Sequence, residues 1–147
     1  MKINYLQTAV CALSFGLLTV LTSGAAHAQA VGFTKGMPFS DAYVAGNTLY
    51  VAGQQGPDDN GKVTGTDITF QTTRAIAAIE KVVKQAGFQM ADIVSVTVYV
   101  ADLADVPAMN KTYIKLMPDP KPARATVKVA GLIGDAKIEI SAIAVKH

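Results

Sequence analysis

The 147-residue chain is half apolar, has 16% charged residues and carries a net charge of only +2. This composition fits one globular domain with a sizeable core, and the absence of a basic run argues against electrostatic binding to nucleic acid. Glycine and proline occur at ordinary frequencies, which excludes collagen-like and low-complexity chains.

Residues 1–28 have the pattern of a secretory signal peptide. Lys2 gives a positive start, Ala9 to Leu21 is an uncharged apolar stretch, and Ala26-His27-Ala28 is a small-x-small cleavage signal. The apolar stretch is short for a bilayer crossing, which needs about 20 residues, so an uncleaved membrane anchor is the less favoured alternative. We expect cleavage after Ala28, a periplasmic or secreted protein without further membrane contact, and a single mature domain over 29–147.

The expected mature domain offers few groups for common catalytic chemistry. Cys11, the only cysteine, lies in the signal peptide, so the domain has no thiol nucleophile, disulfide or thiolate metal site. Its one histidine is the last residue, His147, which excludes a Ser-His-Asp triad and a histidine-based metal site. Phosphate-binding glycine motifs are absent, and residues 58–61 lack the spacing of a calcium loop, so they predict a hairpin loop.

The first part of the mature chain predicts an arm followed by a hairpin. Residues 29–37 show no periodicity and are expected to form the arm. Two short apolar stretches, 42–45 and 48–54, flank the turn dipeptide Gly46-Asn47, as is typical of a hairpin. Gly53 near the end of the second stretch indicates a bulge or the close approach of a ligand.

A long helix is predicted next. Apolar residues recur at helical spacing from Ile68, with Asp67 as the N-cap and Gly87 as the residue that ends the helix. Arg74 and Glu80 are interpreted as members of its solvated face.

The second half of the chain predicts one strong strand, a second helix and two final strands. The strand spans 93–100 and places four valines on the face expected to pack against helices: Val94, Val96, Val98 and Val100. Asp105 is the expected N-cap of a helix that runs to about Met117, and a proline-rich loop breaks it. Strands are expected at 125–129 and 137–145.

The predicted order is therefore strand, strand, helix, strand, helix, strand, strand. This order predicts an α+β domain in which a mixed sheet is covered on one face by two helices. The other face of the sheet, with Tyr50 and the row Ser95, Thr97 and Tyr99, is left for water or another subunit.

Two rare charges mark the final strands. The chain has only two arginines and two glutamates, and one of each, Arg124 and Glu139, interrupts these alternating stretches. A guanidinium can bind a carboxylate through two hydrogen bonds, and a shielded carboxylate can orient or deprotonate water. A structural salt bridge between neighbouring strands explains the same pattern equally well.

Several stretches together resemble a known family. They are PF at 38–39, GNTLYVAGQ at 46–54, DIV at 92–94, YVADL at 99–103, NKTY at 110–113, PARAT at 122–126 and KIEISAIAV at 137–145. In this order they resemble the RidA/YjgF family of reactive-imine deaminases, once called the L-PSP endoribonuclease family. The resemblance implies a chorismate-mutase-like fold and a homotrimer with clefts between subunits. It also implies hydrolysis of 2-imino acids, such as 2-iminobutanoate and 2-iminopropanoate, without a metal or organic cofactor.

The resemblance also assigns roles to residues. Arg124 matches the family's carboxylate-binding arginine and Glu139 its water-orienting glutamate, and these two are the expected catalytic residues. The further positions expected to contact the substrate are Phe39, Gly53, Asn110 and Thr126.

Four departures leave the pocket wall less polar than is usual in the family. Phe39 stands where tyrosine is frequent, Ala52 replaces a serine, Ser141 replaces a second acid and Ile133 replaces a proline. The alternatives to a deaminase are a non-catalytic binder of small carboxylates and a ribonuclease, with a holdase that uses exposed apolar surface as a third.

Overall fold

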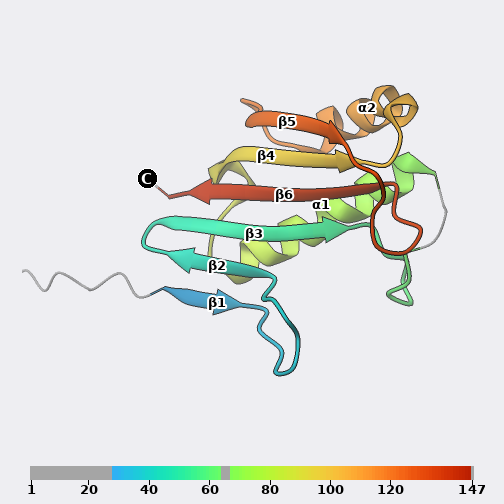
Figure 1. Ribbon diagram of the computed structural model, residues 1–147. Helices are drawn as coiled ribbons and strands as arrows, with labels where there is room; N and C mark the ends of the chain where they lie inside the picture. Colours follow the sequence, from blue (N-terminus) through green and yellow to red (C-terminus); the bar gives the residue numbers. More distant parts are fainter. Residues whose placement is uncertain (1–27, 64–66, 147) are drawn as a thin grey trace, which may run out of the picture.

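The computed structural model describes residues 28–63 and 67–146. The expected signal peptide (residues 1–28) therefore falls almost wholly outside the described residues, as does His147. The described chain forms one mixed sheet with both long helices on a single side (Figure 1). The predicted α+β class, with two helices covering one face, is confirmed.

Six strands form the sheet, in the order β1-β2-β3-β6-β4-β5. Their bounds are β1 (Gln29–Val31), β2 (Ala42–Ala45), β3 (Thr48–Gln55), β4 (Ile93–Val100), β5 (Ala123–Lys128) and β6 (Ile138–Val145). Neighbouring strands are antiparallel except β4 and β5, which run parallel and are joined through a helix. The last strand of the chain, β6, thus lies in the middle of the sheet between β3 and β4 (Figure 1).

Strand β1 corrects the predicted order, which began with two strands rather than three. Gln29 pairs with Val44 and Val31 with Ala42 of β2. Three residues are too few to show a period in the sequence, and the unpaired edge of β2 supplies the hydrogen-bonding partner that makes them a strand.

Two α-helices, α1 (Ile68–Gln85) and α2 (Val106–Leu116), cover the sheet. The caps predicted for α1 are confirmed: the Oδ1 atom of Asp67 accepts a hydrogen bond from the backbone N–H of Phe70 at 3.0 Å. At the other end Gly87 has φ +75°, a conformation that glycine adopts without strain. No helix of the described residues is long and apolar enough to cross a membrane.

The apolar core lies between the helices and the sheet, and a bulge in β4 changes which residue enters it. The register of β4 against β6 shifts between Ile93 and Ser95. Ile93 is therefore buried at 4% exposure, whereas Val94, predicted to lie on the packed face, is 43% exposed. The other three valines of that strand are buried as predicted.

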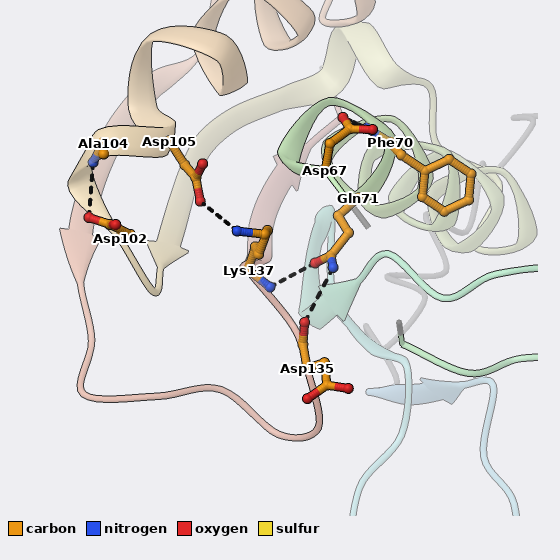
Figure 2. A network of polar contacts seen from close by, with 8 residues as sticks. All are labelled: Asp67, Phe70, Gln71, Asp102, Ala104, Asp105, Asp135 and Lys137. Carbon is orange, nitrogen blue, oxygen red and sulfur yellow. Dashed lines mark hydrogen bonds and ion pairs between the residues drawn. The ribbon is translucent and has the colours of Figure 1, made fainter. Parts of the chain in front are cut away.

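A polar network joins α1 to the segments before α2 and β6 (Figure 2). The fully buried Gln71 accepts a hydrogen bond from the backbone N–H of Lys137 at 2.7 Å and donates one to the carbonyl of Asp135 at 3.3 Å. Lys137 Nζ lies 3.3 Å from Asp105 Oδ2. Asp105 is the N-cap residue of α2, as predicted, but its side chain makes no capping hydrogen bond.

The capping carboxylate is instead three residues earlier. Asp102 accepts from the backbone N–H of Ala104 at 3.1 Å and caps the short 3₁₀-helix η2 (Leu103–Asp105), which runs directly into α2 (Figure 2). A similar 3₁₀-helix, η1 (Met90–Asp92), leads into β4.

Candidate active site

The guanidinium of Arg124 is held by three side chains of α2. Its Nη2 donates to Asn110 Oδ1 at 2.7 Å, and its Nη1 lies 4.0 Å from the sulfur of Met109. The guanidinium carbon lies 4.6 Å from the centre of the Tyr113 ring, a cation–π contact. These contacts fix an exposed cation in the lining of a cavity of about 330 Å³.

Three buried hydroxyls have no hydrogen-bond partner among the described residues: that of Thr72 in α1, and those of Tyr113 and Thr126 in the two elements that build the Arg124 centre. Thr126 lies on the same face of β5 as Arg124, because the two residues are two apart on one strand. Burial raises the pKa of Tyr113, and the nearby positive charge of Arg124 partly opposes this shift. The phenol therefore stays neutral at physiological pH, and the ring presents an uncharged face to the cation.

The carboxylate of Glu139 is held by strand β3. Its Oε2 accepts a hydrogen bond from Gln55 Nε2 at 2.9 Å. Its Oε1 lies in the space that a side chain at Gly53 would occupy, since a Cβ atom there would collide with this oxygen. The predicted bulge at Gly53 is confirmed, because the β3–β6 register shifts between Val51 and Gln54.

Glu139 and Gly53 line a second cavity of about 480 Å³, with Phe39 among its walls. Pro57, which also lines it, accepts a hydrogen bond through its carbonyl from Arg74 Nε at 2.9 Å, and Arg74 forms an ion pair with Asp59 at 2.8 Å. Arg74 was predicted to be merely solvated, but it ties the loop beside this cavity to α1. Glu80 does lie on the helix surface, where it pairs with Lys84.

The two charged centres lie on opposite faces of the sheet. Arg124 is in register with Val96, whose side chain is buried beneath the helices. Glu139 is in register with Tyr99, on the other face, and it alternates with the buried Ile138 and Ile140. Strand β4 also separates β5 from β6, which places these two strands about 10 Å apart.

This arrangement removes one interpretation of the sequence. A salt bridge between Arg124 and Glu139 within one chain requires neighbouring strands and a shared face, and neither condition holds. The expected site residues form two groups instead. Asn110 and Thr126 lie with Arg124, whereas Phe39 and Gly53 lie with Glu139.

Sequence reasoning missed two residues at these centres. Tyr113 falls inside the predicted second helix without an assigned role, although its aromatic ring, one turn after Asn110, was an available signal. Gln55 stood at the start of a turn-rich loop, and nothing in its spacing pointed to Glu139. No cluster of three or more His, Cys, Asp or Glu side chains able to hold a metal ion occurs within 28–63 and 67–146.

Residues 32–146 match the family model described as Endoribonuclease L-PSP. The chain belongs to this family, also known as RidA/YjgF. A RutC family protein from Pyrococcus abyssi is 42% identical over 111 residues, which are 75% of this chain and 87% of that protein.

Other members of the L-PSP family carry more specific names. A 2-iminobutanoate/2-iminopropanoate deaminase from Dermatophagoides farinae is 37% identical over 110 residues, which are 74% of this chain and 85% of that protein. Among solved structures, RidA from an Antarctic Psychrobacter species superposes with a TM-score of 0.74 at 28% identity, covering 80% of this chain and 99% of that one. The fold of this L-PSP family member is thus the family's own.

Proposed function

We propose that this L-PSP family protein hydrolyses 2-imino acids of the 2-iminobutanoate and 2-iminopropanoate type to 2-oxo acids and ammonia. The observation that carries the proposal is the pairing of a guanidinium fixed for anion binding with a carboxylate held beside a cavity of its own. Two relatives that are 37% and 34% identical to this chain are named 2-iminobutanoate/2-iminopropanoate deaminases. No cofactor is needed for this reaction, because the substrate and water suffice.

Arg124 binds the substrate carboxylate in this mechanism. Asn110 occupies one nitrogen of the guanidinium and Tyr113 covers its face, so the planar group cannot rotate freely. A fixed guanidinium can still offer further N–H donors, which suits two parallel hydrogen bonds to a carboxylate. The unpartnered hydroxyl of Thr126 is a further donor on the same face.

Glu139 holds and activates the water. Water attacks the carbon of the protonated imine while Glu139 takes one of its protons, which gives a neutral carbinolamine and a protonated carboxyl. The carboxyl then returns that proton to the nitrogen, the C–N bond breaks, and the C=O bond forms as the hydroxyl proton leaves with ammonia. The balance is one iminium and one water in, one 2-oxo acid and one ammonium out.

The complete site is shared between copies of the chain. The carboxylate carbon and the imine carbon of a 2-imino acid are adjacent atoms, about 1.5 Å apart, so the arginine and the glutamate must converge on one small molecule. Arg124 and Glu139 of one chain lie on opposite faces of its sheet. A homotrimer in which Arg124 of one chain faces Glu139 of the next satisfies both requirements.

The test is imine hydrolysis by the purified protein, with imines generated in place by an amino-acid oxidase. We expect wild type to accelerate the release of 2-oxo acid, and Arg124→Ala and Glu139→Ala to abolish this acceleration while the trimer persists. Full activity in either variant refutes the assignment. Saturable 2-oxobutanoate binding without turnover identifies a binder instead, and Arg124-dependent RNA cleavage a ribonuclease.

We also propose that the protein is exported, on the sequence pattern of residues 1–28. Strand β1 starts at Gln29, so cleavage after Ala28 leaves all described strands and helices intact. N-terminal sequencing of the protein from a fractionated host tests this, and an uncut cytosolic product contradicts it.

A further inference from the structure

We propose that Gln55 is a positioning residue for Glu139: it holds one carboxylate oxygen so that the other faces the attacking water. This inference deepens the proposed imine hydrolysis and rests on it. Gln55 and Glu139 are paired by the register of the central strands β3 and β6, which the sequence alone does not predict.

The bulge in β3 brings Gln55 to Glu139. Between Thr48 and Val51 the strand pairs in one register with β6, and beyond the bulge the partners move by one residue, to Gln54 with Ile140 and Gln55 with Glu139. Without the extra residue, Gln54 would stand opposite Glu139. Residues directly opposite in an antiparallel pair lie on one face with their Cβ atoms about 5 Å apart. The bulge therefore selects Gln55 as the neighbour of the carboxylate.

The hydrogen bond between them has a fixed polarity. An ionised carboxylate only accepts hydrogen bonds, so the amide nitrogen of Gln55 must face Oε2, as the 2.9 Å contact shows. A donor to a charged acceptor makes one of the stronger hydrogen bonds of proteins. A free glutamate loses rotamer entropy when it is ordered, and this contact orders Glu139 before substrate arrives.

The second oxygen has a different environment. Oε1 lies where Gly53 has no side chain, in the wall of the 480 Å³ cavity. The same bulge that aligns Gln55 thus places a glycine beside Oε1. One oxygen is bound by the neighbouring strand, and the other is directed to the space where water and substrate meet.

The experiment compares two nearly isosteric variants of the trimeric protein. Gln55→Leu removes the donor, and Gln55→Glu replaces it with a repelling carboxylate. We expect kcat to fall about tenfold in Gln55→Leu, because the loss of a hydrogen bond to a charged group has an effect of about this size. KM should stay unchanged, because Arg124 still binds the substrate. The kcat of Gln55→Glu should fall further than that of Gln55→Leu, because its second carboxylate repels Glu139. Gln85→Leu, a matched change of an exposed glutamine at the end of α1, should keep the wild-type rate.

A spectroscopic readout separates positioning from folding and from the reaction. The chain has only two glutamates, so ¹³C-glutamate labelling gives two carboxyl signals, and Glu80→Gln assigns them. Gln55→Leu should move the signal of Glu139 and leave that of Glu80 unchanged.

The two readouts also separate the inference from the proposed function. If Gln55→Leu keeps the wild-type kcat and the Glu139 signal while Glu139→Ala is inactive, the positioning role is wrong and the deaminase stands. If wild type hydrolyses no imine but the Glu139 signal still moves, the contact is supported and the deaminase is wrong.

Discussion

The Arg124 centre and the Glu139 centre are built by different means. Arg124 projects from an edge strand and is fixed by side chains of a helix, which contribute an amide, a sulfur and an aromatic ring. Glu139 belongs to a central strand and is fixed by irregular backbone, a bulge with a glycine and one amide. The first centre thus depends on side chains of a helix, whereas the second also requires the absence of a side chain at Gly53. Substitutions should therefore affect them differently.

The largest expected effect tests whether the two centres meet only across subunits. Arg124→Ala and Glu139→Ala should each be inactive alone. After the two proteins are unfolded together and reassembled, about a quarter of the sites in a cyclic trimer receive an intact arginine from one chain and an intact glutamate from the next. We expect imine hydrolysis to return to about that fraction of wild type. No recovery in verified mixed trimers means that both residues act within one chain.

Gly53→Ala should be the most damaging single change at the Glu139 centre outside the carboxylate itself. The added methyl group collides with Glu139 Oε1, and such overpacking costs about 1–3 kcal/mol. We expect kcat to fall about 100-fold, at about 1.4 kcal/mol for each tenfold. Denaturant unfolding and steady-state kinetics measure the two effects.

Gly131→Ala is the matched control for that change. A methyl group at Gly131 has no atom within 4 Å, and its backbone does not require glycine. Equal losses in the two variants would show that the Gly53 effect is not due to the carboxylate.

Tyr113→Leu should weaken the Arg124 centre by a smaller amount. It removes the ring from beneath the guanidinium, and a cation–π contact at an exposed site is worth about 1 kcal/mol, or about fivefold in KM. Tyr113→Phe keeps the ring and removes a hydroxyl that has no partner among the described residues, so its KM should match wild type. A raised KM in Tyr113→Phe would assign the role to the hydroxyl rather than to the ring.

The smallest expected effect is a loss of stability at alkaline pH. The pKa of Tyr113 is raised by burial, so the folded state retains its proton more tightly than the unfolded chain, whose tyrosines titrate near pH 10. The contribution of Tyr113 to the free energy of unfolding is therefore constant below about pH 10 and declines as pH rises above it. In denaturant titrations the free energy of unfolding of Tyr113→Phe should decline less between pH 9 and 11 than that of wild type. Parallel pH dependences of the two proteins would contradict the assignment.

Much of the fold was predictable because local signals agreed with it. The caps of α1 at Asp67 and Gly87 and the alternation of β6 depend on neighbours in the sequence. Strand β1 and the exposed Val94 were not predictable, since an edge pairing and a one-residue bulge leave no local period.

The candidate site was predictable in composition but not in arrangement. The scarcity of arginine and glutamate singled out Arg124 and Glu139. Their separation depends on β4 lying between β5 and β6, a strand order set by long-range pairing and by the helical crossover from β4 to β5. The role of Gln55 depends on the bulge that shifts it by one position, which only the three-dimensional register reveals.

The central place of β6 also has a consequence for how the chain folds during synthesis. Until this last strand leaves the ribosome, β3 and β4 each have an unpaired edge in the middle of the future sheet. Unpaired strand edges expose backbone groups that can join to other chains. The nascent protein therefore cannot complete this sheet before β6 is synthesised, and a chain that ends before β6 lacks both Glu139 and the strand that unites the two halves of the sheet.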